Sequence, residues 1–155
     1  PVVEVAPAAL HAPVVLSTQE TGGMSSLAIG TDGCVVAADR SGHVTRSIDN
    51  GRTWTPTANA LPAVPRLEIG GPIPQRGWSL AVGNNGELYA ALASSNFEQR
   101  GVFRSTDKGD TWTSINMGVP YWGVESLVID PDGYLYAGTV TRGVLRSAQT
   151  IPTSR

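Results

Sequence analysis

An eight-residue pattern, S-x-D-x-G-x-T-W, occurs twice in the chain, at residues 47–54 and 105–112. Its Asp carboxylate can accept hydrogen bonds from backbone N–H groups one or two residues ahead, and its Gly can adopt a positive φ that a Cβ would penalise. Thr and Trp then begin a strand, with the Trp ring buried and its N–H on a partner. Each copy therefore predicts a tight β-hairpin. The structural residues would be Ser47, Asp49, Gly51 and Trp54 in the first copy and Ser105, Asp107, Gly109 and Trp112 in the second.

Three longer segments, at residues 26–37, 79–90 and 126–137, align with one another. Each consists of a strand, an Asp-Gly or Asn-Gly turn and a second strand, and such pairs favour hairpins because both residues tolerate a positive φ. The aligned segments start about 50 residues apart, a spacing typical of stacked repeat units. A third strand follows each segment and ends in Arg-Ser. A structural contact made once per repeat is therefore expected of three arginines, Arg46, Arg104 and Arg146.

The repeated pattern resembles the Asp-box, or BNR, repeat of sialidase-like β-propellers, and the resemblance extends over residues 24–147. It implies an all-β fold built of blades, each of which is a four-stranded antiparallel sheet. The third copy of the pattern has decayed after Ser147, so residues 14–17 are expected to supply the outer strand of a third blade. We expect an extended arm or linker over residues 1–13, then a unit over 14–155 with about three blades, near 24–57, 78–115 and 124–147 plus 14–17.

Three blades cannot close into a ring, since propellers have about four to eight. We predict either a homodimer that closes a six-bladed ring, or completion by other blades or subunits of an assembly. In the homodimer, residues 14–17 would complete the third blade of the other chain.

Composition and charge exclude several classes of partner and cofactor. The formal net charge of -2 argues against nucleic acid, and no apolar run is long enough for membrane insertion. The single cysteine, Cys34, lies in an apolar run and is expected to be buried and inert. His11 and His43 have no Cys, Asp or Glu at metal-ligand spacing, so neither a metal site nor a cofactor is expected.

No catalytic residue is predicted. Sialidases of the family that the pattern resembles use an Arg-Ile-Pro segment, an arginine triad and a Tyr nucleophile. The most similar stretch here, residues 71–74, lacks the Arg. Glycoside hydrolysis in general needs two carboxylates that face one cleft, and no such pair stands out among the acidic residues.

A candidate ligand or partner face lies in the long loops at residues 58–77, 94–100 and 116–123. The first of these loops is too long to be a simple connection, and aromatic side chains beside arginines suit a sugar ring or a protein loop. The residues predicted for this face are Arg66, Arg76, Trp78, Phe97, Arg100, Tyr121 and Trp122. The alternative for Trp78 and Trp122 is packing in the central channel or against the next blade.

The function expected from these features is that of a non-enzymatic scaffold or protein-interaction module, an accessory subunit of an extracytoplasmic assembly. A carbohydrate-binding lectin and a fragment of a glycoside hydrolase are the alternatives. A repeated sugar site would repeat its ligands, but the three loops differ in length and content, which favours a single protein-contact surface. The secreted or extracytoplasmic location is implied by the family, whose members are mostly exported.

Overall fold

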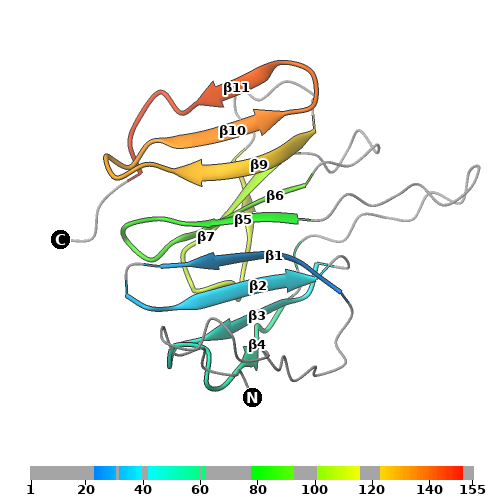
Figure 1. Ribbon diagram of the computed structural model, residues 1–155, viewed down its shortest axis with the longest axis vertical. Helices are drawn as coiled ribbons and strands as arrows, with labels where there is room; N and C mark the ends of the chain where they lie inside the picture. The colour runs from blue at the N-terminus through cyan, green and yellow to red at the C-terminus, as the bar shows by residue number, and fades with distance from the viewer. Residues whose placement is uncertain are drawn as a thin grey trace, which may run out of the picture.

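The chain folds into three antiparallel β-sheets that follow one another along its long axis (Figure 1). The structure, a computed structural model, describes residues 23–30, 32–39, 42–59, 61, 78–92, 101–115 and 123–151. Within these ranges there is no helix, and hence none that is long and apolar enough to cross a membrane. The predicted arm over 1–13 and the predicted strand over 14–17 lie outside the described residues.

Each sheet is a meander in which consecutive strands pair. The first sheet contains β1 (Met24–Ile29), β2 (Val35–Asp39), β3 (Val44–Ser47) and β4 (Thr55–Pro56). The second contains β5 (Trp78–Val82), β6 (Leu88–Leu92), β7 (Gly101–Ser105) and β8 (Thr113–Ser114). The third contains β9 (Val124–Ile129), β10 (Leu135–Thr139) and β11 (Gly143–Arg146), and no fourth strand is present within residues 123–151.

The first hairpin of each sheet turns at the predicted Asp-Gly or Asn-Gly pair, but only the glycine uses a positive φ. Gly33 and Gly86 both have a φ of 79°. In the first two sheets, the residue before the glycine instead uses its side chain as an acceptor. The N–H of Cys34 donates to Asp32 Oδ1 (3.0 Å), and the N–H of Glu87 donates to Asn85 Oδ1 (3.1 Å). In the third sheet, Asp130 Oδ1 accepts from the Tyr134 N–H (2.8 Å). The turn is therefore closed by one permissive backbone position and one side-chain cap.

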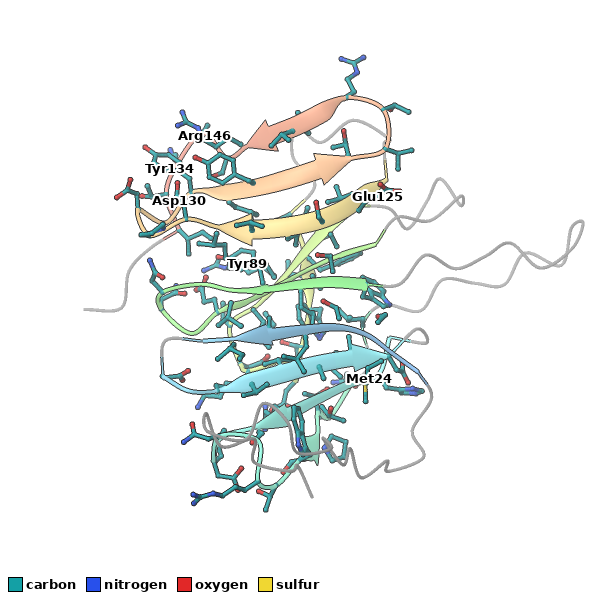
Figure 2. The ribbon with its side chains drawn as sticks, in the orientation of Figure 1. Met24, Tyr89, Glu125, Asp130, Tyr134 and Arg146 are labelled. Atoms are coloured by element: carbon teal, nitrogen blue, oxygen red, sulfur yellow. The ribbon has the colours of Figure 1, made fainter. Side chains whose placement is uncertain are left out.

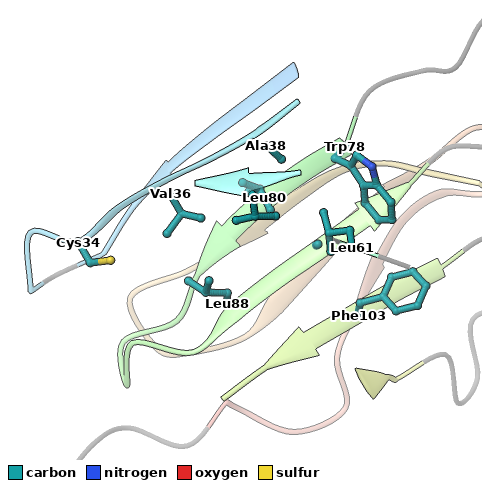
Figure 3. Close-up of a cluster of buried hydrophobic side chains, with 10 residues drawn as sticks. Cys34, Val36, Ala38, Leu61, Trp78, Leu80, Leu88 and Phe103 are labelled. Atoms are coloured by element: carbon teal, nitrogen blue, oxygen red, sulfur yellow. The ribbon is translucent and has the colours of Figure 1, made fainter. Parts of the chain in front are cut away.

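Two apolar clusters hold the three sheets together, one at each junction between neighbouring sheets. The first junction buries Val36, Ala38 and Val44 of the first sheet against residues of the second. Figure 3 shows this cluster, in which Leu80 and Phe103 come from the second sheet. Burying one such large apolar side chain contributes about 1.5–3 kcal/mol.

The second junction repeats this arrangement with residues from the opposite face of the second sheet. Ala81, Tyr89 and Val102 of the second sheet pack there against Leu127 and Leu135 of the third. Successive side chains on a strand point to opposite faces, so the second sheet serves both clusters at once.

The inner strands of the three sheets, β1, β5 and β9, lie side by side (Figure 1) and are joined by serine side chains. The N–H of Leu80 donates to Ser26 Oγ (2.9 Å), and the N–H of Leu127 donates to Ser79 Oγ (3.0 Å). The same repeat position therefore fixes the relative placement of neighbouring sheets at both junctions.

Candidate functional site

The first copy of the repeated pattern forms a turn between β3 and β4 that is closed by its own side chains. Asp49 Oδ1 accepts hydrogen bonds from the Ser47 hydroxyl (2.7 Å) and the Thr53 N–H (2.8 Å), and Oδ2 accepts one from the Thr53 hydroxyl (2.6 Å). Ser47 Oγ accepts from the Gly51 N–H (2.8 Å), and Trp54 Nε1–H donates to the Gly51 carbonyl (3.1 Å). Each residue that the two copies of the pattern share thus takes part in a hydrogen bond.

The second copy, between β7 and β8, makes the same set of bonds at the same distances. Two details differ from the sequence-based expectation. The Asp carboxylate reaches the N–H four residues ahead, not one or two, and a positive φ of 59° occurs at Asn50 and Lys108 in addition to the glycines. Because two successive residues adopt the left-handed backbone conformation, the chain turns back and places the Thr beside the Asp carboxylate.

These turns determine the protonation of their carboxyl groups. Hydrogen bonds from the Thr side chain, the Thr backbone and the Ser hydroxyl hold the pKa of Asp49 and of Asp107 at about 2. In the third sheet, the backbone N–H of Tyr134 and the hydroxyl of Tyr136 similarly lower the pKa of Asp130. These three aspartates are therefore ionised hydrogen-bond acceptors within their own turns.

Each of the three arginines at one repeat position makes a structural contact, as expected, but the partner differs from sheet to sheet. Arg46 Nη1 bridges the first junction, where it donates to the Lys108 carbonyl (2.9 Å) and to Asp110 Oδ2 (3.2 Å). Arg104 stays within the second sheet, and Arg146 lies over the ring of Tyr134, 4.5 Å from its centroid. Figure 2 shows Arg146, Tyr134 and Asp130 together at the outer end of the third sheet. The group that each arginine contacts therefore depends on the residues that surround it.

A polar network lies at the second junction. Arg104 Nε donates to Glu87 Oε2 (2.8 Å), Arg104 Nη2 donates to Glu87 Oε1, and the buried Tyr89 hydroxyl donates to Glu87 Oε2 (2.8 Å). The arginine lowers the pKa of Glu87, while burial and the adjacent carboxylate raise the pKa of Tyr89. Each polar group in this network has a charged or hydrogen-bonding partner, which makes it structural.

Of the seven residues predicted for a ligand or partner face, the structure describes only Trp78. Its side chain is 4% exposed and packs edge-on against Phe103, with ring centroids 5.9 Å apart (Figure 3). Trp78 is therefore a core residue of the first junction, which is the alternative given for it above. The other six residues lie outside the described residues and remain predictions: Arg66, Arg76, Phe97, Arg100, Tyr121 and Trp122.

One polar pair was not predicted from the sequence. His43 Nδ1 lies 3.0 Å from Asp39 Oδ2, and the His43 N–H donates to Asp39 Oδ1 (2.9 Å). The pair closes the loop between β2 and β3, and only the four-residue separation across a hairpin could have suggested it. Among the described residues, no group of three or more His, Cys, Asp or Glu is placed to hold a metal ion.

The apolar residues left exposed at the two ends of the described sheets were also not predicted from the sequence. We call the side of the first sheet that is turned away from the second sheet the leading face, with Leu27 and Ile29. Leu27 is 58% exposed, whereas its repeat equivalents Leu80 and Leu127 are 7% and 5% exposed. Alignment of the three leucines would have located this face once the order of the sheets was known.

We call the opposite end, the side of the third sheet turned away from the second, the trailing face. It carries Val128, Tyr136 and Val144, which are the repeat equivalents of Ala81, Tyr89 and Val102 in the second sheet. Val144 is 71% exposed and its equivalent Val102 is 3% exposed. Both ends therefore expose side chains of the kind that are buried at the inner junctions.

No family model matches this sequence, and no curated protein matches it. Solved structures do match. A GH74 enzyme from Niastella koreensis is 20% identical with a TM-score of 0.57, and the match covers 83% of this chain and 21% of that one. A structure of YCF48 bound to a D1 peptide is 17% identical with a TM-score of 0.51, covering 86% and 39% of the two chains. A GH74 xyloglucanase from Xanthomonas campestris is 22% identical with a TM-score of 0.51, covering 88% and 19%.

These neighbours are β-propellers, and the three meandering sheets of this chain superimpose on part of them. This chain has a β-propeller fold. The fold class predicted from the sequence is thereby confirmed, and each sheet is a propeller blade. The chain spans less than half the length of each of these neighbours, which is consistent with an incomplete propeller that needs other blades or partners.

Proposed function

We propose that this chain is a non-enzymatic β-propeller unit of the Asp-box kind, a scaffold or protein-interaction module in an accessory subunit of an assembly outside the cytoplasm. The observation that carries the proposal is the pair of apolar faces left open at the two ends of the described sheets. Exposed apolar surface of this kind typically marks protein contact. The repeated turns between them are rigid and closed by local bonds, as a scaffold requires.

The state of four described carboxyl groups supports a scaffold over a hydrolase. A general acid in glycoside hydrolysis needs a pKa raised toward the working pH. The pKa values of Asp49, Asp107, Asp130 and Glu87 are all shifted in the opposite direction, by hydrogen bonds that hold turns or a blade junction. The likeness to GH74 enzymes therefore extends to the fold, and none of these four carboxyl groups has the raised pKa of a general acid.

The partner face is proposed to be built by the loops at 58–77, 94–100 and 116–123, on the aromatic and arginine residues predicted for them. Aromatic residues and arginine dominate protein-binding hot spots. The YCF48 structure contains a bound peptide. This supports a peptide or protein segment as the class of ligand for the present β-propeller unit.

A comparison of peptide and glycan binding tests the proposal. The chain would be panned against a displayed peptide library and, in parallel, applied to a glycan array that includes xyloglucan oligosaccharides. We expect peptides that bind with micromolar affinity, loss of that binding in Trp122→Ala and Arg100→Ala, and unchanged binding in Ile48→Ala. Ile48 is exposed in the turn after β3 and lies outside the three loops.

Two results would contradict the proposal. Micromolar binding of a sugar that Trp122→Ala removes would favour the lectin. Release of reducing ends from xyloglucan that a single Asp or Glu substitution abolishes would favour the hydrolase.

A further inference from the structure

We propose that the leading face of one copy of this chain docks on the trailing face of a second copy, so that two copies close a ring of six blades. Such closure uses the same open faces that support the proposed function, but its test is the mass of the assembly and not the binding of a peptide by the loops. Either test can therefore fail while the other succeeds.

The apolar residues of the two faces match those of the inner junctions. At the second junction, Tyr89 and Val102 of the second sheet lie in one buried apolar cluster with Leu127 of the third sheet. On the trailing face, Tyr136 and Val144 stand at the repeat positions of Tyr89 and Val102. The face that would cover them must present a leucine at the position of Leu127.

The leading face presents that leucine. Leu27 aligns with Leu80 and Leu127, and Ile29 aligns with Ile129, which packs against the second junction cluster. Because Leu27 and Ile29 are exposed in one copy, they are free to cover the trailing face of another. The contact would continue the same packing that already joins the described sheets.

A hydrogen-bond acceptor on the third sheet supports the same placement. The N–H of Leu80 donates to Ser26 Oγ at the first junction (2.9 Å), and Ser79 Oγ accepts the equivalent bond at the second (3.0 Å). Ser126 holds this repeat position in the third sheet, and its hydroxyl has no hydrogen-bond partner within the described residues. Strand β1 is the unpaired inner edge of the first sheet, so the Leu27 N–H of a second copy would donate to Ser126 Oγ.

The charges at the new junction differ from those at the first junction in one respect. Arg46 of the first sheet binds Asp110, which belongs to the turn of the second sheet (3.2 Å). In the proposed ring, Arg146 takes the place of Arg46, and Arg52 of the second copy takes the place of Asp110. Two like charges then lie close together at each new junction. Repulsion between these two charges weakens the proposed contact, and a substitution that reverses one of the charges should strengthen it.

A second copy is the occupant that the repeat favours, because one chain carries both halves of the junction. Two units of three blades give six, which is within the range of about four to eight that closes a propeller. Head-to-tail contacts form a closed assembly when the rotation closes, and the proposal requires it to close after two copies. Each of the two copies then buries both of its open faces.

The first test is the molar mass of the 155-residue chain by light scattering over a range of concentrations. We expect twice the 16.2 kDa of a single chain. Leu27→Glu and Val144→Glu should each give a monomer, with a dissociation constant raised at least about a hundredfold, since each places a charge in both new junctions. Both positions are exposed in a single chain, so circular dichroism and urea unfolding of the monomer should show an intact fold.

Ile48→Glu is the matched control. Ile48 is 74% exposed and apolar, but its repeat equivalent Thr106 stays exposed at the first junction. The proposed contact therefore leaves Ile48 uncovered, and Ile48→Glu should remain a dimer.

Mixing the two monomeric variants tests the head-to-tail geometry. A Leu27→Glu chain keeps its trailing face and a Val144→Glu chain keeps its leading face, so an equimolar mixture retains one intact junction. We expect a one-to-one complex that is weaker than the wild-type dimer and absent from either variant alone. A dimer made through two leading faces or two trailing faces would leave one of the two variants dimeric.

The charge substitution should act in the favourable direction. Arg52→Asp places a carboxylate where Asp110 lies at the first junction, and it acts at both new junctions. Because an exposed ion pair is a modest interaction, we expect the dissociation constant to fall about fivefold to twenty-fivefold.

Any of four results would overturn the proposal. They are a wild-type monomer at about 100 µM, a mass that rises beyond two chains with concentration, dissociation by Ile48→Glu as complete as that by Leu27→Glu, and a dimer that survives both Leu27→Glu and Val144→Glu.

Discussion

Ser105→Ala should destabilise the chain through a single buried backbone group. Ser105 is 1% exposed, and its Oγ accepts a hydrogen bond from the buried N–H of Gly109 (2.8 Å) while its hydroxyl donates to Asp107 (2.7 Å). In Ser105→Ala, the Gly109 N–H loses its acceptor inside the turn and water has little access to replace it. Leaving such a buried donor unsatisfied costs about 1–3 kcal/mol, so we expect a loss of about 2 kcal/mol in the free energy of unfolding.

Urea unfolding followed by tryptophan fluorescence measures this loss, since Trp112 belongs to the same turn. The variant and the wild type must be compared at one protein concentration, because any association adds to the apparent stability. The melting temperature should fall by about 4–8 °C for a chain of this length. Thr106→Ala is the control, because Thr106 is the exposed neighbour and its change should stay within about 0.5 kcal/mol. Equal destabilisation by Ser105→Ala and Thr106→Ala would refute this account of the turn.

Three further predictions test the core, the turns and the polar network. Trp78→Ala should lower the free energy of unfolding by about 3–5 kcal/mol in urea, as expected for a buried aromatic residue, and a loss under 1 kcal/mol would return Trp78 to a surface role. The pKa of Asp107 is depressed in the folded state, so its contribution to the free energy of unfolding is present above the unfolded value near 3.8 and is lost as pH falls toward 2. The loss of stability between pH 5 and 2 should therefore be smaller in Asp107→Asn than in the wild type. An identical pH profile for the two proteins would contradict this. Burial and Glu87 raise the pKa of Tyr89, so in an alkaline absorbance titration one tyrosine should ionise only when the chain unfolds. Tyr89→Phe should abolish this late ionisation. If the late ionisation persists in Tyr89→Phe, the buried phenol belongs to another tyrosine.

The strands and the repeated turns could be predicted from the sequence because their determinants are local. A glycine at a fixed offset and an acceptor two to four residues from its donor fix the hairpin wherever the sheet lies, as the bonds of Asp49 and Asp107 show. Such patterns are visible in one short stretch of sequence.

The contacts of the three equivalent arginines could not be predicted in the same way. Arg46 binds Asp110 of the next sheet, a residue more than one repeat away, whereas Arg104 binds Glu87 of its own sheet. Which of these two contacts an arginine makes depends on a single side chain in a neighbouring turn. The position of the arginine in the repeat does not specify that side chain. The role of Trp78 was ambiguous for the same reason, because its burial requires the first sheet to lie against it.

The second sheet belongs to both apolar clusters, while each outer sheet belongs to one, and the two clusters share no residue. Opening an outer sheet therefore breaks one junction, but opening the middle sheet breaks both. Repeat proteins with contacts only between neighbours fray from their ends for this reason. In the monomeric Leu27→Glu variant, amide hydrogens of β5, β6 and β7 should therefore exchange with solvent more slowly than those of β1 to β3 and β9 to β11, so that the slowest-exchanging core of the single chain is one sheet out of three.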